Sequence, residues 1–170
     1  MTFLVPQATL EIEFDRTEEK EGMTMSLEHE WEQEMKLLLS DLGCDFCSVG
    51  ILDTKSRILT WKLAVGNMSD RYQQISEKPG RGFHKSVIKI GRAMAFQMAE
   101  LVANRQMQEY PILMSEHLRS AYAVPIMEGH QVVGVLLIGN RSNRVFQPED
   151  RIRAASAGEC VAESLAAMRS

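Results

Sequence analysis

The sequence predicts an α+β fold with a central antiparallel sheet and helices packed on one face. The first observation is a hairpin pattern, in which two apolar runs rich in β-branched residues, 120–127 and 132–138, flank a turn at Gly129. The second is a helical pattern at each end of the series of strands, an apolar stripe over 24–42 and a narrow stripe of small residues after Pro148, over 148–168. Hairpins bracketed by helices are typical of layered α+β domains.

The beginning of the chain differs in composition from the rest. We predict an acidic N-terminal extension over 1–22, followed by one domain over 23–170. Five glutamates make the extension acidic: Glu11, Glu13, Glu18, Glu19 and Glu21. Apolar residues alternate with two of them over 10–14. Two interpretations therefore stay open, a short edge strand and an arm that is mobile or binds a partner.

A helix is expected over 24–42 because apolar residues recur at intervals of three and four, at Leu27, Trp31, Met35, Leu38 and Leu42. Gly43 is a suitable terminator. The apolar stripe is compatible with packing on the sheet and with a dimer interface.

The middle of the chain predicts further strands and a short helix. Apolar runs over 46–52 and 58–65 are separated by turn-forming residues. Lys78-Pro-Gly-Arg-Gly82 then interrupts the chain and starts a short helix over 83–90. Residues 93–96 are expected to form a central strand.

Composition excludes several classes of protein. The 170 residues carry a net charge of −4 with a pI of about 5.6, so no basic surface indicates nucleic acid. No apolar run reaches the roughly 18 residues that a membrane span needs. Three cysteines, an odd number, favour a reducing compartment. We expect a cytoplasmic protein that binds neither nucleic acid nor membrane.

No catalytic or metal-binding pattern stands out. The histidines are far apart in the sequence, at His29, His84, His117 and His130. Cys44 and Cys47 form a single Cys-x-x-Cys pair, and a structural zinc needs four ligands. We expect these two cysteines on opposite faces of a strand, as small buried side chains or in a thiol or metal role. No enzymatic activity, metal or cofactor is predicted.

Two features have the chemistry of an anion site. Gly80-Arg-Gly82 precedes a short helix, whose first amides have no partner inside the helix and carry partial positive charge. Trp61 lies in the middle of a strand, where a buried indole needs an acceptor for its N–H. Each feature is also compatible with an ordinary turn or with core packing.

The order of these elements resembles that of a GAF domain over about residues 24–168. The resemblance rests on the end of the chain, with Ala123-Val-Pro-Ile126, the strand over 132–138, Phe146, and Pro148-Glu-Asp150 opening a helix. A GAF fold does not by itself imply a particular ligand.

Within this fold the chain is similar to NreA-type nitrate receptors in five segments: Trp61-Lys62, Gly66-Asn67, Ser69-Asp-Arg-Tyr72, Gly80-Arg-Gly82 and Tyr110-Pro-Ile-Leu-Met-Ser-Glu116. Such receptors are stand-alone GAF proteins that act with an oxygen-sensing histidine kinase and its response regulator. The resemblance implies a cytoplasmic nitrate sensor that modulates this kinase as a homodimer.

The resemblance also implies a site. An indole N–H, two backbone amides and an apolar wall would hold nitrate, supplied respectively by Trp61, by Phe83 and His84, and by Tyr110, Pro111 and Ile112. Such a site suits a weakly hydrated anion, since neutral donors bind it at low desolvation cost. We expect Tyr122 and Val124 of the hairpin near its floor.

Two other functions stay open. One is a GAF-type reductase of free methionine sulfoxide, which needs a reactive cysteine in the pocket. The other is a GAF module for dimerisation or partner binding with a different small ligand.

Overall fold

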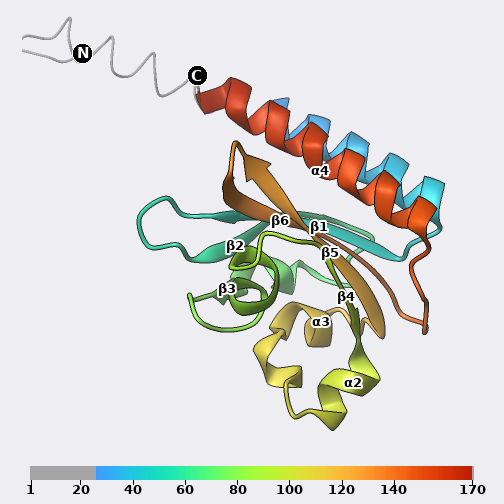
Figure 1. The fold of residues 1–170 in the computed structure, drawn as a ribbon. Helices are drawn as coiled ribbons and strands as arrows, with labels where there is room; N and C mark the ends of the chain where they lie inside the picture. The colour runs from blue at the N-terminus through green and yellow to red at the C-terminus, as the bar shows by residue number, and fades with distance from the viewer. Residues whose placement is uncertain (1–25, 170) are drawn as a thin grey trace, which may run out of the picture.

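The computed structural model describes residues 26–169, which form one six-stranded antiparallel sheet covered on both faces (Figure 1). The strand order is β3-β2-β1-β6-β5-β4. The strands are β1 (Phe46–Leu52), β2 (Leu59–Val65), β3 (Ser76–Glu77), β4 (Met94–Gln97), β5 (Ser120–Glu128) and β6 (Gln131–Asn140). The predicted extension over 1–22 lies outside the described residues.

Two long helices cover one face of the sheet, as predicted. They are an N-terminal helix, described over residues 26–42, and α4 (Pro148–Arg169), and they run side by side in Figure 1. The predicted stripe is confirmed, because Trp31, Met35 and Leu38 are buried in a core shared with Val161 of α4. We call this side the helix face.

Short helical segments cover the opposite face, which we call the site face. They are η1 (Asp70–Gln74), η2 (His84–Ile88), α2 (Met98–Ala103), η3 (Met107–Glu109) and α3 (Pro111–Ser115). The helix predicted over 83–90 is a π-helical turn, η2. A second hydrophobic core lies beneath these segments, so the sheet separates two cores.

The strand expected at the centre of the sheet is at its edge. β4 pairs only with β5 in the described sheet and ends the strand order. The reason is visible in its burial: Met94 and Ala95 are exposed, and of its residues only Phe96 is buried. A short apolar run was therefore insufficient to indicate a central strand.

The predicted hairpin is confirmed, with β5 and β6 paired from Ser120↔Asn140 to Glu128↔Gln131. Because side chains alternate along a strand, Ala121 and Ala123 contact the core of the site face while Tyr122 and Val124 contact that of the helix face. The expectation that Tyr122 and Val124 lie near the floor of the site is wrong, since both side chains lie in the core on the opposite face of the sheet.

An ion pair between the partly exposed Arg141 and a buried carboxylate holds α3 in place. The Glu116 carboxylate, fully buried just after α3, accepts hydrogen bonds from Arg141 Nη2 and from the Met68 amide, both at 2.8 Å. Arg141 also donates to the backbone carbonyls of Glu116 and Gly66. The end of β6 is thereby tied to α3 and to the loop after β2.

We predict that Arg141→Ala lowers the free energy of unfolding by about 3 kcal/mol, because it leaves the Glu116 carboxylate buried without its cation. Urea denaturation measures this change. The control is Lys36→Ala, which removes the cation of an exposed pair with Glu32 and is expected to cost less than about 1 kcal/mol. Equal effects of the two substitutions would contradict the anchoring role.

Candidate functional site

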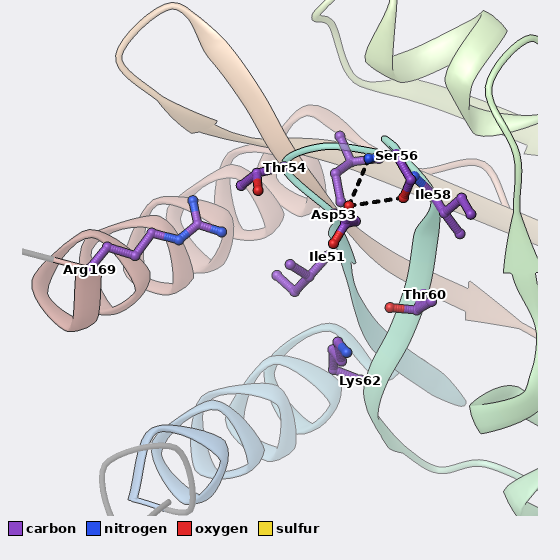
Figure 2. Close-up of a pocket in the computed structure, with 9 residues that line it drawn as sticks. Ile51, Asp53, Thr54, Ser56, Ile58, Thr60, Lys62 and Arg169 are labelled. Atoms are coloured by element: carbon purple, nitrogen blue, oxygen red, sulfur yellow. Dashed lines mark hydrogen bonds between the residues drawn. The ribbon is translucent and has the colours of Figure 1, made fainter. Parts of the chain in front are cut away.

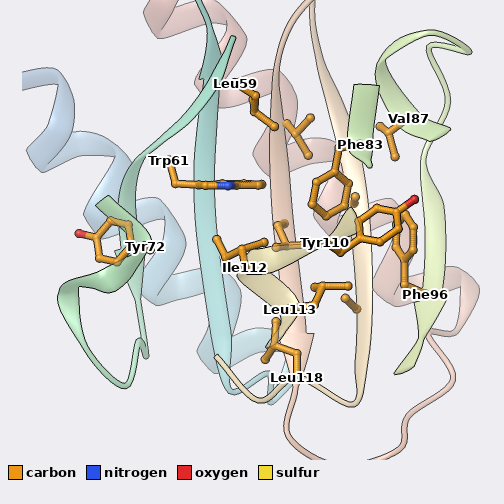
Figure 3. Packing of buried hydrophobic residues seen from close by; sticks show 14 of the residues in the cluster. Leu59, Trp61, Tyr72, Phe83, Val87, Phe96, Tyr110, Ile112, Leu113 and Leu118 are labelled. Atoms are coloured by element: carbon orange, nitrogen blue, oxygen red, sulfur yellow. The ribbon is translucent and has the colours of Figure 1, made fainter. Parts of the chain in front are cut away.

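An aromatic cluster forms the centre of the site face (Figure 3). The ring of Phe83 makes edge-to-face contacts with Trp61 at 5.7 Å, Phe96 at 5.4 Å and Tyr110 at 4.9 Å between centroids. Ile112 is fully buried in the same core. The structure therefore brings together four of the six residues predicted for the ligand site.

Trp61 lies flat against the sheet because β1 carries Gly50 opposite it. A Cβ at Gly50 would lie only 2.9 Å from the indole Cε3. The indole is 2% exposed, and its Nε1 has no hydrogen-bond partner among the described residues. Since a buried N–H without an acceptor is costly, this atom indicates the place of a missing acceptor.

In the turn before η2, two backbone amides donate hydrogen bonds to carboxylates of the protein itself. Phe83 N–H donates to Glu77 Oε1 at 3.2 Å, and Gly82 N–H donates to Glu109 Oε1 at 3.4 Å. Gly82 has φ +52°, and a Cβ there would collide with the Glu109 carbonyl and lie 2.6 Å from Glu77 Oε1. Only glycine fits this turn.

Glu77 is the functional candidate that sequence reasoning missed. Its Cα pairs with that of Leu59 across β3 and β2, and both side chains are buried. Burial without a cationic partner raises the pKa of its carboxyl from 4.5 to about 8, although the Phe83 amide acts in the opposite direction. Its Oε2 is buried and has no partner in the described chain. In the sequence, Glu77 stands next to Lys78-Pro79, where an exposed turn is expected. Its burial becomes evident only from the pairing of β3 with β2.

His84 points away from the aromatic cluster. Its Nε2 donates to the carbonyl of Arg57 at 2.6 Å, and its backbone N–H donates to the Arg81 carbonyl at 3.1 Å. The imidazole lines a separate cavity of about 430 Å³ that Lys85 and Lys89 also border. The predicted contribution of its amide to ligand binding stays a prediction.

The wall predicted over Tyr110, Pro111 and Ile112 is the start of α3. Pro111 occupies the first helical position, where its fixed φ is suitable and its missing N–H costs nothing. Tyr110 Oη donates to Ser86 Oγ at 3.1 Å, and burial raises the pKa of the Tyr110 hydroxyl. Pro111 also borders a cavity of about 220 Å³ that reaches Glu77, Arg81 and Glu109 from solvent.

A larger cavity of about 440 Å³ lies near the β1–β2 turn and is bordered by Arg169 (Figure 2). It is lined by Thr60 and Lys62, which flank Trp61 in the chain. The Asp53 carboxylate, which lines it, stabilises the turn by accepting hydrogen bonds from the amides of Lys55 and Ser56. This cavity contains none of the predicted site residues.

The cysteines lie away from the site. β1 begins at Phe46, so Cys44 precedes the strand, and both Cys44 and Cys47 contact the core of the helix face. The expectation that they lie on opposite faces is therefore wrong. Burial raises the pKa of the Cys44 thiol to about 11 and raises those of Cys47 and Cys160. Within residues 26–169 no group of three acidic, His or Cys side chains could hold a metal ion.

Comparison with known proteins identifies the family. The GAF domain model matches residues 34–162, and the chain belongs to the GAF domain family. No curated protein sequence matches. None of the helices in the described range is long and apolar enough to cross a membrane.

Among solved structures, the chain is similar to two structures of an NreA protein from Staphylococcus aureus mutated in its nitrate-binding site. One has 29% identity and a TM-score of 0.60, over 70% of this chain and 91% of that chain. The other has 28% identity and a TM-score of 0.63, over 74% and 98%. A free methionine-R-sulfoxide reductase from Thermoplasma acidophilum, at 14% identity and a TM-score of 0.69 over 86% and 96%, shares the fold.

We predict that Glu77 makes stability fall as pH rises. Between pH 4.5 and about 8 the folded protein holds a proton on Glu77 that the unfolded chain releases, so the free energy of unfolding decreases across this window. The contribution is fully present below pH 4.5 and is lost as pH rises through about 8, with a slope of up to about 1.4 kcal/mol per pH unit.

Urea denaturation of the wild type and Glu77→Gln from pH 4 to 9 measures this slope. The difference between the two curves cancels the groups that both proteins share. A constant difference across the window would contradict the prediction.

Proposed function

We propose that this protein is a nitrate receptor that binds one nitrate ion on the site face without chemical conversion. The observation that carries the proposal is the Trp61 Nε1, a buried donor with no partner in the described chain, at the edge of the cluster formed by Phe83, Tyr110 and Ile112. The similarity to the S. aureus NreA protein supports nitrate as the ligand.

The physical character of the cluster favours nitrate over harder anions. The interior around Trp61 is aromatic and aliphatic, and among residues 26–169 no lysine or arginine is buried in the core of this face. A doubly charged sulfate or phosphate loses far more hydration free energy on entering such a site than a singly charged, delocalised ion does. The indole and the amides of Phe83 and His84 are the donors proposed to hold it.

The proposed role is regulatory, through a sensor histidine kinase whose activity depends on whether nitrate is bound. Ligand binding alters the partner only if nitrate has different affinities for two states of the receptor. The turn over 80–84 and the segment leading to α3 are the parts of the site that nitrate would order. The two long helices, with Leu37 and Ile152 exposed on them, are the surface proposed for dimer or kinase contacts.

We predict that nitrate binds saturably in isothermal titration calorimetry and that Trp61→Phe weakens its binding about 10- to 150-fold. The substitution keeps an aromatic ring but removes one hydrogen bond to a charged ligand, which corresponds to about 1.5–3 kcal/mol. The matched control is Trp31→Phe, since the Trp31 indole N–H is equally buried and unpartnered but lies on the helix face. We expect wild-type affinity from this control.

Sulfate and chloride serve as ligand controls in the same experiment. Saturable binding of sulfate with the affinity of nitrate would contradict the proposed ligand. An unchanged affinity in Trp61→Phe would remove the indole from the site.

The alternative function, reduction of free methionine sulfoxide, lacks a nucleophile in the right place. The three cysteines lie before β1, at its start and on α4, and their raised pKa values disfavour the reactive thiolate. We predict no thiol-dependent turnover of free methionine sulfoxide, measured as consumption of reductant. Turnover that is abolished by a Cys→Ser substitution would overturn the assignment as a receptor.

A further inference from the structure

We propose that Glu77 controls entry to the anion site, because its neutral carboxyl tolerates a bound anion and its ionised carboxylate excludes it. The inference rests on the proposed function and adds to the nitrate site a role for Glu77 and for the protonation of its carboxyl. Nitrate binding at alkaline pH would then bring one proton from solvent onto the Glu77 carboxyl.

The first step of the argument is position. The register Leu59↔Glu77 places Glu77 beside β2, two residues along that strand from Trp61, with Leu59 and Trp61 on the same face. Glu77 reaches the amide of Phe83, whose ring contacts the indole. The carboxyl and the indole thus contact the same residue, the carboxyl at its amide and the indole at its ring.

The second step is competition for a donor. Glu77 Oε1 accepts the Phe83 N–H at 3.2 Å, the amide proposed to bind nitrate. An ion that takes this donor must displace a carboxylate oxygen or share the amide with it. Displacement leaves a buried carboxylate with no partner, since Oε2 already has none in the described chain.

The third step is charge. In the described part of the chain no buried cation lies around the carboxyl: Leu59 from β2 is apolar, and the segment over η3 and α3 contributes Glu109 and Tyr110. Lys78 and Arg81, from the loop of Glu77 itself, are exposed and border the cavity toward solvent. Two negative charges in such a site repel strongly, and protonating Glu77 removes one of them.

The proton balance follows from the titration of this group. Below pH 7 the carboxyl, with a pKa of about 8, is already neutral, and nitrate enters without proton exchange. Above pH 8 each nitrate that binds requires Glu77 to take up one proton from water or buffer. The apparent dissociation constant then rises about tenfold per pH unit.

The experiment is nitrate calorimetry on the full chain from pH 6 to 9.5. For the wild type we expect a constant affinity below pH 7 and a tenfold loss per unit above pH 8. Titration at pH 9 in two buffers with different ionisation enthalpies is expected to give close to one proton taken up per nitrate. This pair of measurements needs no variant, so it tests the proposal even if a substitution prevents folding.

Glu77→Gln is expected to bind nitrate with the low-pH affinity at every pH and with no proton uptake, because its amide is permanently neutral. The matched control is Glu109→Gln, which alters the other carboxylate at the same turn and is expected to keep the wild-type slope. Nitrate binding that is independent of pH in the wild type, or a slope retained in Glu77→Gln, overturns the role of Glu77 and leaves the receptor function intact. Absence of saturable nitrate binding in both proteins at all pH values overturns the receptor function, and the role of Glu77 with it.

Discussion

The packing of the Phe83 ring is the contact on which the site depends. Its edge-to-face contacts with Trp61, Phe96 and Tyr110 connect β2, β4 and the start of α3, which are separate in the sequence. Each such pair is worth about 0.5–1.5 kcal/mol beyond the area that it buries. Because the ring is held from three sides, the backbone before it has to make a tight turn. Gly82, at positive φ and with no space for a Cβ, allows that turn.

This turn lies beside two buried polar groups that are incompletely satisfied, the Glu77 carboxyl and the Trp61 indole N–H. Buried polar atoms are unfavourable when they lack partners, as do the second oxygen of the Glu77 carboxyl and the Trp61 indole N–H within the described chain. Neither is needed to fill the core, since apolar side chains of similar size would pack there at lower cost. Residual polar groups of this kind are expected where a protein binds a ligand, and the proposed nitrate site gives each of them a role.

Much of the fold could be predicted from the sequence, for identifiable reasons. Hydrophobic periodicity located the helix over 24–42, and apolar runs located the strands over 46–52 and 58–65. The helix over 148–168 was located by Pro148 and a narrow stripe of small residues, of which Val161 and Leu165 are buried while Ile152 and Cys160 are exposed. The strand over 93–96 was misplaced because four apolar residues carry no information about which neighbours they pair with. Tyr122 and Val124 were assigned to the wrong face because alternation gives two sets of residues without saying which set meets which helix.

The site was predictable only in part. Trp61, Phe83, Tyr110 and Ile112 were found through resemblance to a family, and the structure gathers them in one cluster. Glu77 was not found, since its importance depends on a two-residue strand, β3, that no periodicity can reveal. The direction of the His84 imidazole likewise depends on the carbonyl of Arg57, 27 residues earlier in the chain.

The division of the interior into two cores restricts how the site can communicate with the rest of the molecule. Between the indole of Trp61 and the long helices lie the strand backbone and the helix-face side chains of the sheet, such as Val49, and at Gly50 the indole packs directly on the main chain of β1. A change on the site face therefore cannot travel to the helices as a relay of side chains packed against one another. It has to pass as a bend or twist of β1 and its neighbours, or through the loops at the edges of the sheet. Because no side chain separates the indole from the main chain at Gly50, a ligand that moves the indole acts directly on the strand that carries Val49 against the long helices.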